Sequence, residues 1–147
     1  MGPPALIAVN HDDYHAKHIG RTADGRQFFL MFTFQGPSPD REGNEFVALY
    51  MFDQKGKFLE AKIDEFGPRD KCDHEKCREV YAQRLRELGS VTFTRIEIEP
   101  FQIERFGTTF GLIAEAPDAD VDRWIATTQP DNCMAFFEPW DSGEYDT

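Results

Sequence analysis

Two stretches in the first part of the chain are apolar at almost every position. In residues 27–35, one face of an extended chain would carry Phe28, Leu30, Phe32 and Phe34, and the other face Phe29 and Met31. In residues 45–52, one face would carry Phe46, Ala48, Tyr50 and Phe52, and the other Val47, Leu49 and Met51. A strand that is apolar on both faces is covered on both sides. We therefore expect two central strands of a sheet.

Turn signals and a third alternating stretch extend this pattern. Asp24-Gly25 lies between Thr22 and Gln27, and both residues tolerate the positive φ of a tight hairpin turn, which would join an earlier strand to residues 27–35. The run Asp53-Gln54-Lys55-Gly56 supplies a second turn. Residues 57–64 then alternate, and we expect the inward positions to be Leu59, Ala61 and Ile63 and the outward ones Glu60 and Lys62. The chain up to residue 64 therefore predicts an antiparallel meander of four strands.

Residues 74–88 favour an α-helix. Apolar side chains recur there at spacings of three and four, at Cys77, Val80, Tyr81, Leu85 and Leu88. Asp73 is placed to cap the start of this helix, and Gly89 is placed to end it. We expect one main helix, lying across one face of the sheet.

Shorter strands are predicted after the helix. In residues 91–99 the apolar positions change face, which indicates either a bulge near Thr94-Arg95 or a strand that begins later. Further strands are predicted at residues 102–105 and 108–114, joined by a hairpin at Phe106-Gly107, and at residues 132–137.

The predicted fold class is α+β. We expect residues 1–147 to form a single domain, mostly antiparallel sheet in a meander of about seven to eight strands, with one main helix near residues 74–88. A chain of 147 residues buries about 70% of the surface that its unfolded form exposes, so its core needs no disulfide or metal.

Composition narrows the class of protein. A hydrophobic fraction of 40% excludes a disordered chain. The formal net charge of −11 argues against sequence-independent binding to nucleic acid. The longest apolar run, Phe28–Phe34, has the length of a strand and predicts no membrane span. Residues 1–9 lack the basic start of a secretory signal, and three cysteines do not make a disulfide framework. We therefore expect a cytoplasmic protein with reduced thiols that binds no membrane.

Two clusters contain side chains that bind metals. His11, His15 and His18 would share one face of a helix, at a spacing that suits two or three imidazoles on zinc, whereas an extended chain would direct His15 and His18 to opposite sides. Cys72, His74 and Cys77 could begin a zinc site, but a structural site needs four ligands and the sequence offers no Cys-x-x-Cys pair to complete it. The alternative for the histidines is a polar N-terminal segment that leads into the first hairpin. The alternative for the cysteines is that they lie in the core or have no functional role.

Motifs for catalysis are missing. The three serines lie outside any G-x-S-x-G elbow, and the chain has no G-x-x-x-x-G-K-S/T or G-x-G-x-x-G phosphate loop. No H-E-x-x-H pair and no EF-hand loop are present. Nothing in the sequence points to an enzyme, and nothing excludes one.

The acidic residues are concentrated at the C-terminal end. From residue 113 onward there are nine carboxylates and one basic residue, Arg123. Such a surface keeps a protein dispersed in water, and it can also steer a basic partner to a docking face. The same segment carries aromatic residues, which either anchor the tail on its own sheet or enter a pocket of the partner. The predicted partner-binding residues are Glu138, Trp140, Asp141, Glu144, Tyr145 and Asp146.

The function indicated by this surface is a non-catalytic interaction or regulatory module that binds a basic protein. A narrower alternative is an immunity or antagonist protein, whose carboxylates take the place of phosphates in the groove of a nuclease. An alternative from another class is a metal-binding protein, with or without enzyme activity, that uses His11, His15 and His18 together with Asp12 or Asp13, with zinc as the metal.

Several short runs resemble one group of small bacterial proteins. These runs are Gly20-Arg21, Asp24-Gly25-Arg26-Gln27-Phe28-Phe29, Phe52-Asp53 with Gly56, and the ending from Phe137 to Thr147 with its Glu-Pro-Trp-Asp sequence. The group is labelled formate hydrogenlyase regulatory protein-like. The resemblance implies a cytoplasmic regulator that acts by protein contact, and it supplies no catalytic residue.

Overall fold

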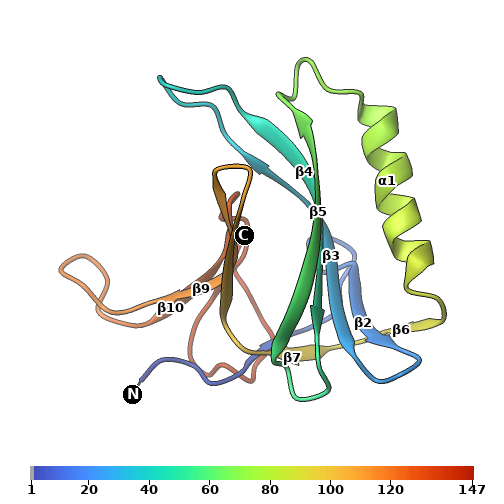
Figure 1. Cartoon of the computed structure of the whole chain (residues 1–147). Helices are drawn as coiled ribbons and strands as arrows, with labels where there is room; N and C mark the ends of the chain where they lie inside the picture. Colours follow the sequence, from blue (N-terminus) through green and yellow to red (C-terminus); the bar gives the residue numbers. More distant parts are fainter. Residues whose placement is uncertain (1) are drawn as a thin grey trace.

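The computed structural model describes residues 2–147 as three antiparallel sheets and one helix (Figure 1). The largest sheet has the order β5-β4-β3-β2-β6, with β2 (His18–Thr22), β3 (Gln27–Gln35), β4 (Asn44–Phe52), β5 (Phe58–Gly67) and β6 (Val91–Phe93). The second sheet has the order β11-β10-β9-β8, with β8 (Phe101–Arg105), β9 (Thr108–Glu115), β10 (Ile125–Gln129) and β11 (Ala135–Phe136). The third pairs β1 (Ile7–Val9) with β7 (Ile96–Ile98).

The five-stranded sheet is the central layer of the molecule. The helix α1 (His74–Glu87) lies along one face, and β8, β9 and β10 lie on the other side (Figure 1). The predicted α+β class with one main helix and mostly antiparallel strands is therefore confirmed. The predicted meander of four strands is also confirmed, because β2, β3, β4 and β5 pair in sequence order.

Both faces of the central strands bury apolar side chains, as their pattern predicts. On the helix side the buried core consists of Phe28, Leu30, Val47, Leu49, Met51 and Cys77. On the other side, Phe29, Met31, Phe46, Ala48, Tyr50 and Phe52 pack against residues of β1, β7, β9, β10 and β11. Alternation along a strand assigns each side chain to one face, so a single stretch of sequence supplies both cores.

The predicted number of seven to eight strands in one meander is wrong. The described residues form eleven strands in three sheets. Residues 91–99 are neither a bulged strand nor one late strand. They divide at Thr94-Arg95, so that β6 extends the edge of the large sheet beside β2, whereas β7 pairs with β1. The change of face in the sequence therefore marks a change of sheet.

Three side chains that we expected to be covered are exposed. Leu59 is 48% exposed because the pairing of β4 with β5 shifts register beside it: Met51 lies opposite Glu60 and Phe52 lies opposite Phe58. Such a bulge changes the direction of a side chain. Phe32 and Phe34 are 49% and 37% exposed. Phe34 lies at the end of β3, where the hairpin to β4 bends away from α1 (Figure 1). Phe32 stacks on Tyr81 of α1 with ring centres 4.2 Å apart, and the rest of its surface is exposed.

The ends of the helix follow the sequence signals. Asp73 is the N-cap, and its carboxylate accepts a hydrogen bond from the backbone N–H of Lys76 at 3.1 Å. Gly89 follows the last turn with a φ of +75°. Glycine adopts this conformation without a steric penalty, which is why it ends helices.

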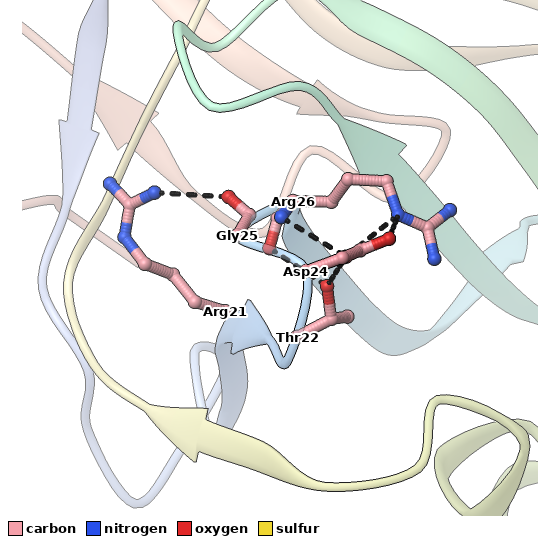
Figure 2. Close-up of polar contacts among 5 residues, drawn as sticks. All are labelled: Arg21, Thr22, Asp24, Gly25 and Arg26. Carbon is pink, nitrogen blue, oxygen red and sulfur yellow. Dashed lines mark hydrogen bonds and ion pairs between the residues drawn. The ribbon is translucent and has the colours of Figure 1, made fainter.

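The predicted Asp24-Gly25 turn joins β2 to β3. Figure 2 shows the Asp24 carboxylate accepting hydrogen bonds from the hydroxyl of Thr22 and from the backbone N–H and Nε of Arg26. Arg21 points the other way and donates from Nη1 to the carbonyl of Gly25 at 3.3 Å (Figure 2). Arg21, Asp24, Gly25 and Arg26, which are among the residues that carry the resemblance described above, thus stabilise a hairpin turn.

Candidate functional site

The C-terminal segment lies along β1 and is held there by backbone hydrogen bonds. The N–H of Ala8 donates to the carbonyl of Trp140 at 2.9 Å, and the N–H of Asn10 donates to the carbonyl of Gly143 at 3.1 Å. Trp140 and Tyr145 pack, partly buried, against the main core. Of the two roles that the sequence left open for the tail aromatics, these two rings take the first and anchor the tail on its own fold.

Asn10 and Arg95 fix the middle of this segment. The amide Nδ2 of Asn10 donates to the carbonyl of Ser142 at 3.1 Å, and its Oδ1 accepts from Nη1 of Arg95 at 3.1 Å. Arg95 also donates through Nη2 to the carbonyl of Asp141. Gly143 has a φ of +75°, and a Cβ atom there would lie 2.3 Å from Oδ1 of Asn10. Only glycine fits this position without displacement of Asn10.

The last residues are fixed by two further contacts. Asp146 and Ala135 exchange backbone hydrogen bonds, each 2.9 Å long. The hydroxyl of Tyr145 donates to the carboxylate of Asp12, which also accepts from the N–H groups of Tyr14 and Ala16. The tail is thereby joined to the histidine segment, although the sequence offered no sign that these two candidate regions touch.

The docked tail encloses a hollow of about 470 Å³. Its lining comprises Phe137, Glu138, Pro139, Ser142, Glu144, Tyr145 and Asp146. The structure thus brings together four of the six predicted partner-binding residues: Glu138, Glu144, Tyr145 and Asp146. Trp140 and Asp141 are outside this lining. We call this feature the acidic hollow.

No basic side chain forms an ion pair with the carboxylates of the acidic hollow within residues 2–147. Glu144 and Asp146 are exposed, and Glu138 is partly exposed. The nearby Arg123, the one basic residue after position 113, places its guanidinium 4.2 Å from the centre of the Phe137 ring. The hollow is therefore an anionic surface with an aromatic wall, suited to receive a cation.

Of the three N-terminal histidines, His11 and His15 lie in the irregular segment before β2, and His18 is the first residue of β2. His11 and His18 pack on the same aromatic ring, and His15 lies apart from them. The ring of His11 stacks on Phe93 at 5.9 Å, and His18 contacts the same ring at 5.4 Å. His15 lies instead 6.3 Å from the ring of Tyr145. In the part of the chain that the structure describes, no group of three or more histidine, cysteine or acidic side chains has the geometry to hold a metal ion. The zinc site at these histidines stays a prediction, which elemental analysis of untagged protein tests.

His18 links the N-terminal segment to the helix. Its Nδ1 lies 2.6 Å from the hydroxyl of Tyr81, which also donates to the carbonyl of Leu30 at 3.3 Å. Burial, followed by the nearby charges of Lys17 and His11, holds the pKa of His18 below the ordinary value for histidine. Burial in the packing between β2 and α1 therefore favours the neutral imidazole over the charged one.

The three cysteines are free thiols. Burial raises the pKa of Cys77 to about 11 and that of Cys133 to about 12, so neither is a nucleophile at neutral pH. Cys77 faces the core from the helix, as its place in the apolar pattern predicted. Cys72 is partly exposed, with its Sγ 3.5 Å from Nε2 of His74.

Comparisons with known proteins give no independent information on the candidate site. The chain matches no protein-family model, no curated protein and no solved structure. In residues 2–147 no helix is long and apolar enough to cross a membrane.

The side chains that build the hollow were only partly visible in the sequence. Its carboxylates and Tyr145 were found from charge and aromatic content, whereas Asn10 and Arg95 were missed and Asp12 was considered only as a metal ligand. Asn10 and Arg95 donate to backbone carbonyls, which carry no residue-specific signal. The change of apolar face at Thr94-Arg95 was the one signal in the sequence that Arg95 lies at a break between two strands.

Proposed function

We propose that this chain is a non-catalytic interaction module that binds a basic protein through the acidic hollow. The observation that carries the proposal is the gathering of Glu138, Glu144 and Asp146 around one hollow, with no ion pair to any of them among the described residues. A surface of this kind attracts cations over several ångströms and raises the rate of encounter with a basic partner.

The shape of the hollow favours a side chain as the bound group. Its volume of about 470 Å³ is within the range of pockets that hold small molecules, and it exceeds what one lysine or arginine side chain needs. Arg123 already covers one face of the Phe137 ring, so the aromatic surface for the aliphatic stem or the guanidinium comes from Tyr145 and the rest of the Phe137 ring. We therefore propose that an arginine or lysine of the partner enters the hollow and that its neighbours pair with the surrounding carboxylates.

The cellular setting of the proposal is the cytoplasm. Three free thiols without a disulfide fit a reducing compartment. The resemblance of residues 137–147 to proteins labelled formate hydrogenlyase regulatory protein-like supports a regulatory role, because the same segment forms the acidic hollow.

Neutralisation of the hollow tests this function. In the variant with Glu138→Gln, Glu144→Gln and Asp146→Asn, the shape of the lining is kept and three charges are lost. We expect that proteins captured by the wild type at low salt are no longer captured by this variant. The matched control carries Glu60→Gln, Glu79→Gln and Glu99→Gln, three exposed carboxylates without an ion pair outside the hollow.

The comparison of the two triple variants decides between a specific site and general charge. If both variants lose the same partners, net charge is the cause and the hollow is not a site. If neither loses any partner, the proposal fails. A titration with Nα-acetyl-argininamide, followed by NMR, gives a second readout, and we expect shifts at residues 137–146 in the wild type and the control only.

A nuclease is a narrower form of the same partner. Its substrate groove is basic, and we propose that the carboxylates around the acidic hollow take the place of the phosphates that bind in that groove. This form predicts that the wild type inhibits a nuclease encoded beside its own gene. It also predicts that the hollow variant loses this inhibition and that the control variant retains it.

A further inference from the structure

A second hollow lies between the loop from β3 to β4 and the loop from β5 to α1. It encloses about 540 Å³, which is within the range of pockets for small molecules. Its lining includes Phe34, Pro37 and Pro68, so much of its surface is apolar. Phe34 is 37% exposed although it is a large aromatic side chain at the end of a central strand. We call this feature the loop hollow.

Two ion pairs connect the loops on either side. Nε of Arg69 lies 3.2 Å from Oε1 of Glu45, and Nζ of Lys71 lies 2.7 Å from Oε1 of Glu42. Four of the five charged groups in the lining are therefore paired with each other. The fifth, the carboxylate of Asp70, forms no ion pair and accepts no hydrogen bond from residues 2–147.

Arg69 retains binding capacity of its own. Its guanidinium lies 4.9 Å from the centre of the Phe34 ring, which fixes its plane over an apolar surface. Only Nε is used in the ion pair with Glu45, and Nη1 and Nη2 have no acceptor within the described chain. These two nitrogens form the edge that a carboxylate binds with two parallel hydrogen bonds.

From this arrangement we propose that the loop hollow binds a free α-amino acid with a large apolar side chain. The carboxylate of the amino acid pairs with Nη1 and Nη2 of Arg69, and its ammonium group pairs with Asp70. Its side chain covers Phe34, Pro37 and Pro68. The hollow offers the two free nitrogens of Arg69 as donors and the unpaired carboxylate of Asp70 as an acceptor, beside an apolar surface, and this combination matches a zwitterion better than a simple anion or cation.

Three related ligands separate the contributions of the two charges. L-Phenylalanine carries both groups, L-phenylalaninamide lacks the carboxylate, and 3-phenylpropionate lacks the ammonium. We expect L-phenylalanine to shift the backbone NMR signals of residues 34–43 and 68–71, and each of the other two to bind about tenfold more weakly. L-Alanine, which lacks the apolar body, should bind more weakly than all three.

Two single variants assign each charge to its residue. With Arg69→Gln, L-phenylalanine and its amide should bind with equal affinity, because the partner of the carboxylate is gone. With Asp70→Asn, L-phenylalanine and 3-phenylpropionate should become equal. Both side chains are exposed, so the fold is retained, and circular dichroism checks this. The controls are Arg86→Gln and Asp13→Asn, exposed residues outside the lining, which should behave as wild type.

Several outcomes would overturn the inference. It fails if L-phenylalanine causes no shift at about 10 mM, a concentration at which even a weak site is largely filled. It fails equally if the three ligands bind alike to the wild type, or if the shifts lie outside the two loops. The acidic hollow plays no part in these measurements, so the two proposals stand or fall separately.

Discussion

Residues 24–87 and residues 88–147 differ in their balance of acidic and basic side chains and in how many of these side chains form ion pairs. The first region has thirteen carboxylates and eleven basic residues, and it contains all five ion pairs of the described chain. The second has twelve carboxylates and only three arginines, and none of its carboxylates is in an ion pair with residues 2–147.

The three arginines of the second region bind groups other than carboxylates. Arg95 donates to the carbonyl of Asp141 and to the side chain of Asn10. Arg105 donates to the carbonyl of Glu104, and Arg123 lies over the ring of Phe137. The scarce cations of this region hold the backbone and an aromatic ring in place, and the carboxylates are left free.

The charged side chains of the first region therefore stabilise the fold through ion pairs, whereas the carboxylates of the second region face the solvent unpaired. In the first region, ion pairs connect strands, loops and helix, as Arg84 of α1 connects to Asp64 of β5. In the second, backbone hydrogen bonds and buried aromatics hold the tail, so its carboxylates add repulsion rather than cohesion. Because these carboxylates repel one another and have no ion pair inside the molecule, a basic partner that binds them would relieve this repulsion.

The largest effect is expected where the docking of the tail is broken. In the variant Gly143→Ala, the new Cβ lies 2.3 Å from Oδ1 of Asn10 and the residue has a φ of +75°. We expect a loss of about 3 kcal/mol in the free energy of unfolding, from backbone strain and from the displaced Asn10 network. Urea denaturation followed by tryptophan fluorescence measures it.

Gly89→Ala is the matched control for backbone strain. Gly89 has the same φ of +75°, but a Cβ there meets no atom within 4 Å. This variant should lose only about 1 kcal/mol, the cost of the left-handed conformation alone. Equal losses in the two variants would show that the Asn10 network contributes nothing to stability.

A medium effect is expected from an ion pair of the first region. Arg84 binds Asp64 through Nε and Nη2, each at 3.0 Å, and both side chains are about three-quarters buried. Arg84→Met should lower the free energy of unfolding by about 1 kcal/mol, since a two-pronged pair is stronger than an exposed one. Arg86→Met, in the same helical turn without an ion pair, should change it little. Similar losses in both variants would contradict the comparison.

Much of the large sheet could be predicted because its signals are local. Alternation assigned Phe28 and Phe29 to opposite faces, and Asp24-Gly25 marked the hairpin. The partners of short strands could not be predicted in this way. Ile96 and Ile98 are fully buried against the three-residue strand β1, whose sequence is too short to carry a periodic pattern.

The candidate site could be predicted in its chemistry but not in its geometry. Charge and aromatic content identified Glu138, Glu144, Tyr145 and Asp146, which line one hollow. The sequence could not show that Trp140 packs on the core, because an exposed and a buried tryptophan have the same neighbours along the chain. The contacts that decide this are made with strands more than a hundred residues away.

A smaller effect of the opposite sign is expected from the acidic hollow. The triple variant Glu138→Gln, Glu144→Gln and Asp146→Asn relieves repulsion, so it should raise the free energy of unfolding by about 0.5 kcal/mol at low ionic strength. At high ionic strength the gain should vanish because salt screens the exposed charges. Denaturation at two salt concentrations measures both values. A loss of stability, or a gain that is independent of salt, would mean that these carboxylates support the fold.

The smallest effect is expected at His18, which lies between the two regions and contacts Tyr81 of α1. Its pKa is lowered in the folded protein, mainly by burial and then by Lys17 and His11, so folding favours the neutral imidazole. The stability that follows from this is fully present above the pKa of an unfolded histidine, about 6.5, and is lost as the pH falls through the lowered folded value.

Denaturation of wild type and His18→Gln at pH 7.5 and pH 5.5 isolates this contribution. We expect the wild type to lose more stability than the His18→Gln variant between these pH values, and His15→Gln, which keeps His18, is the control for the loss of a histidine. An equal loss in all three proteins would show that the carboxylates, and not His18, govern the acid side of the stability curve.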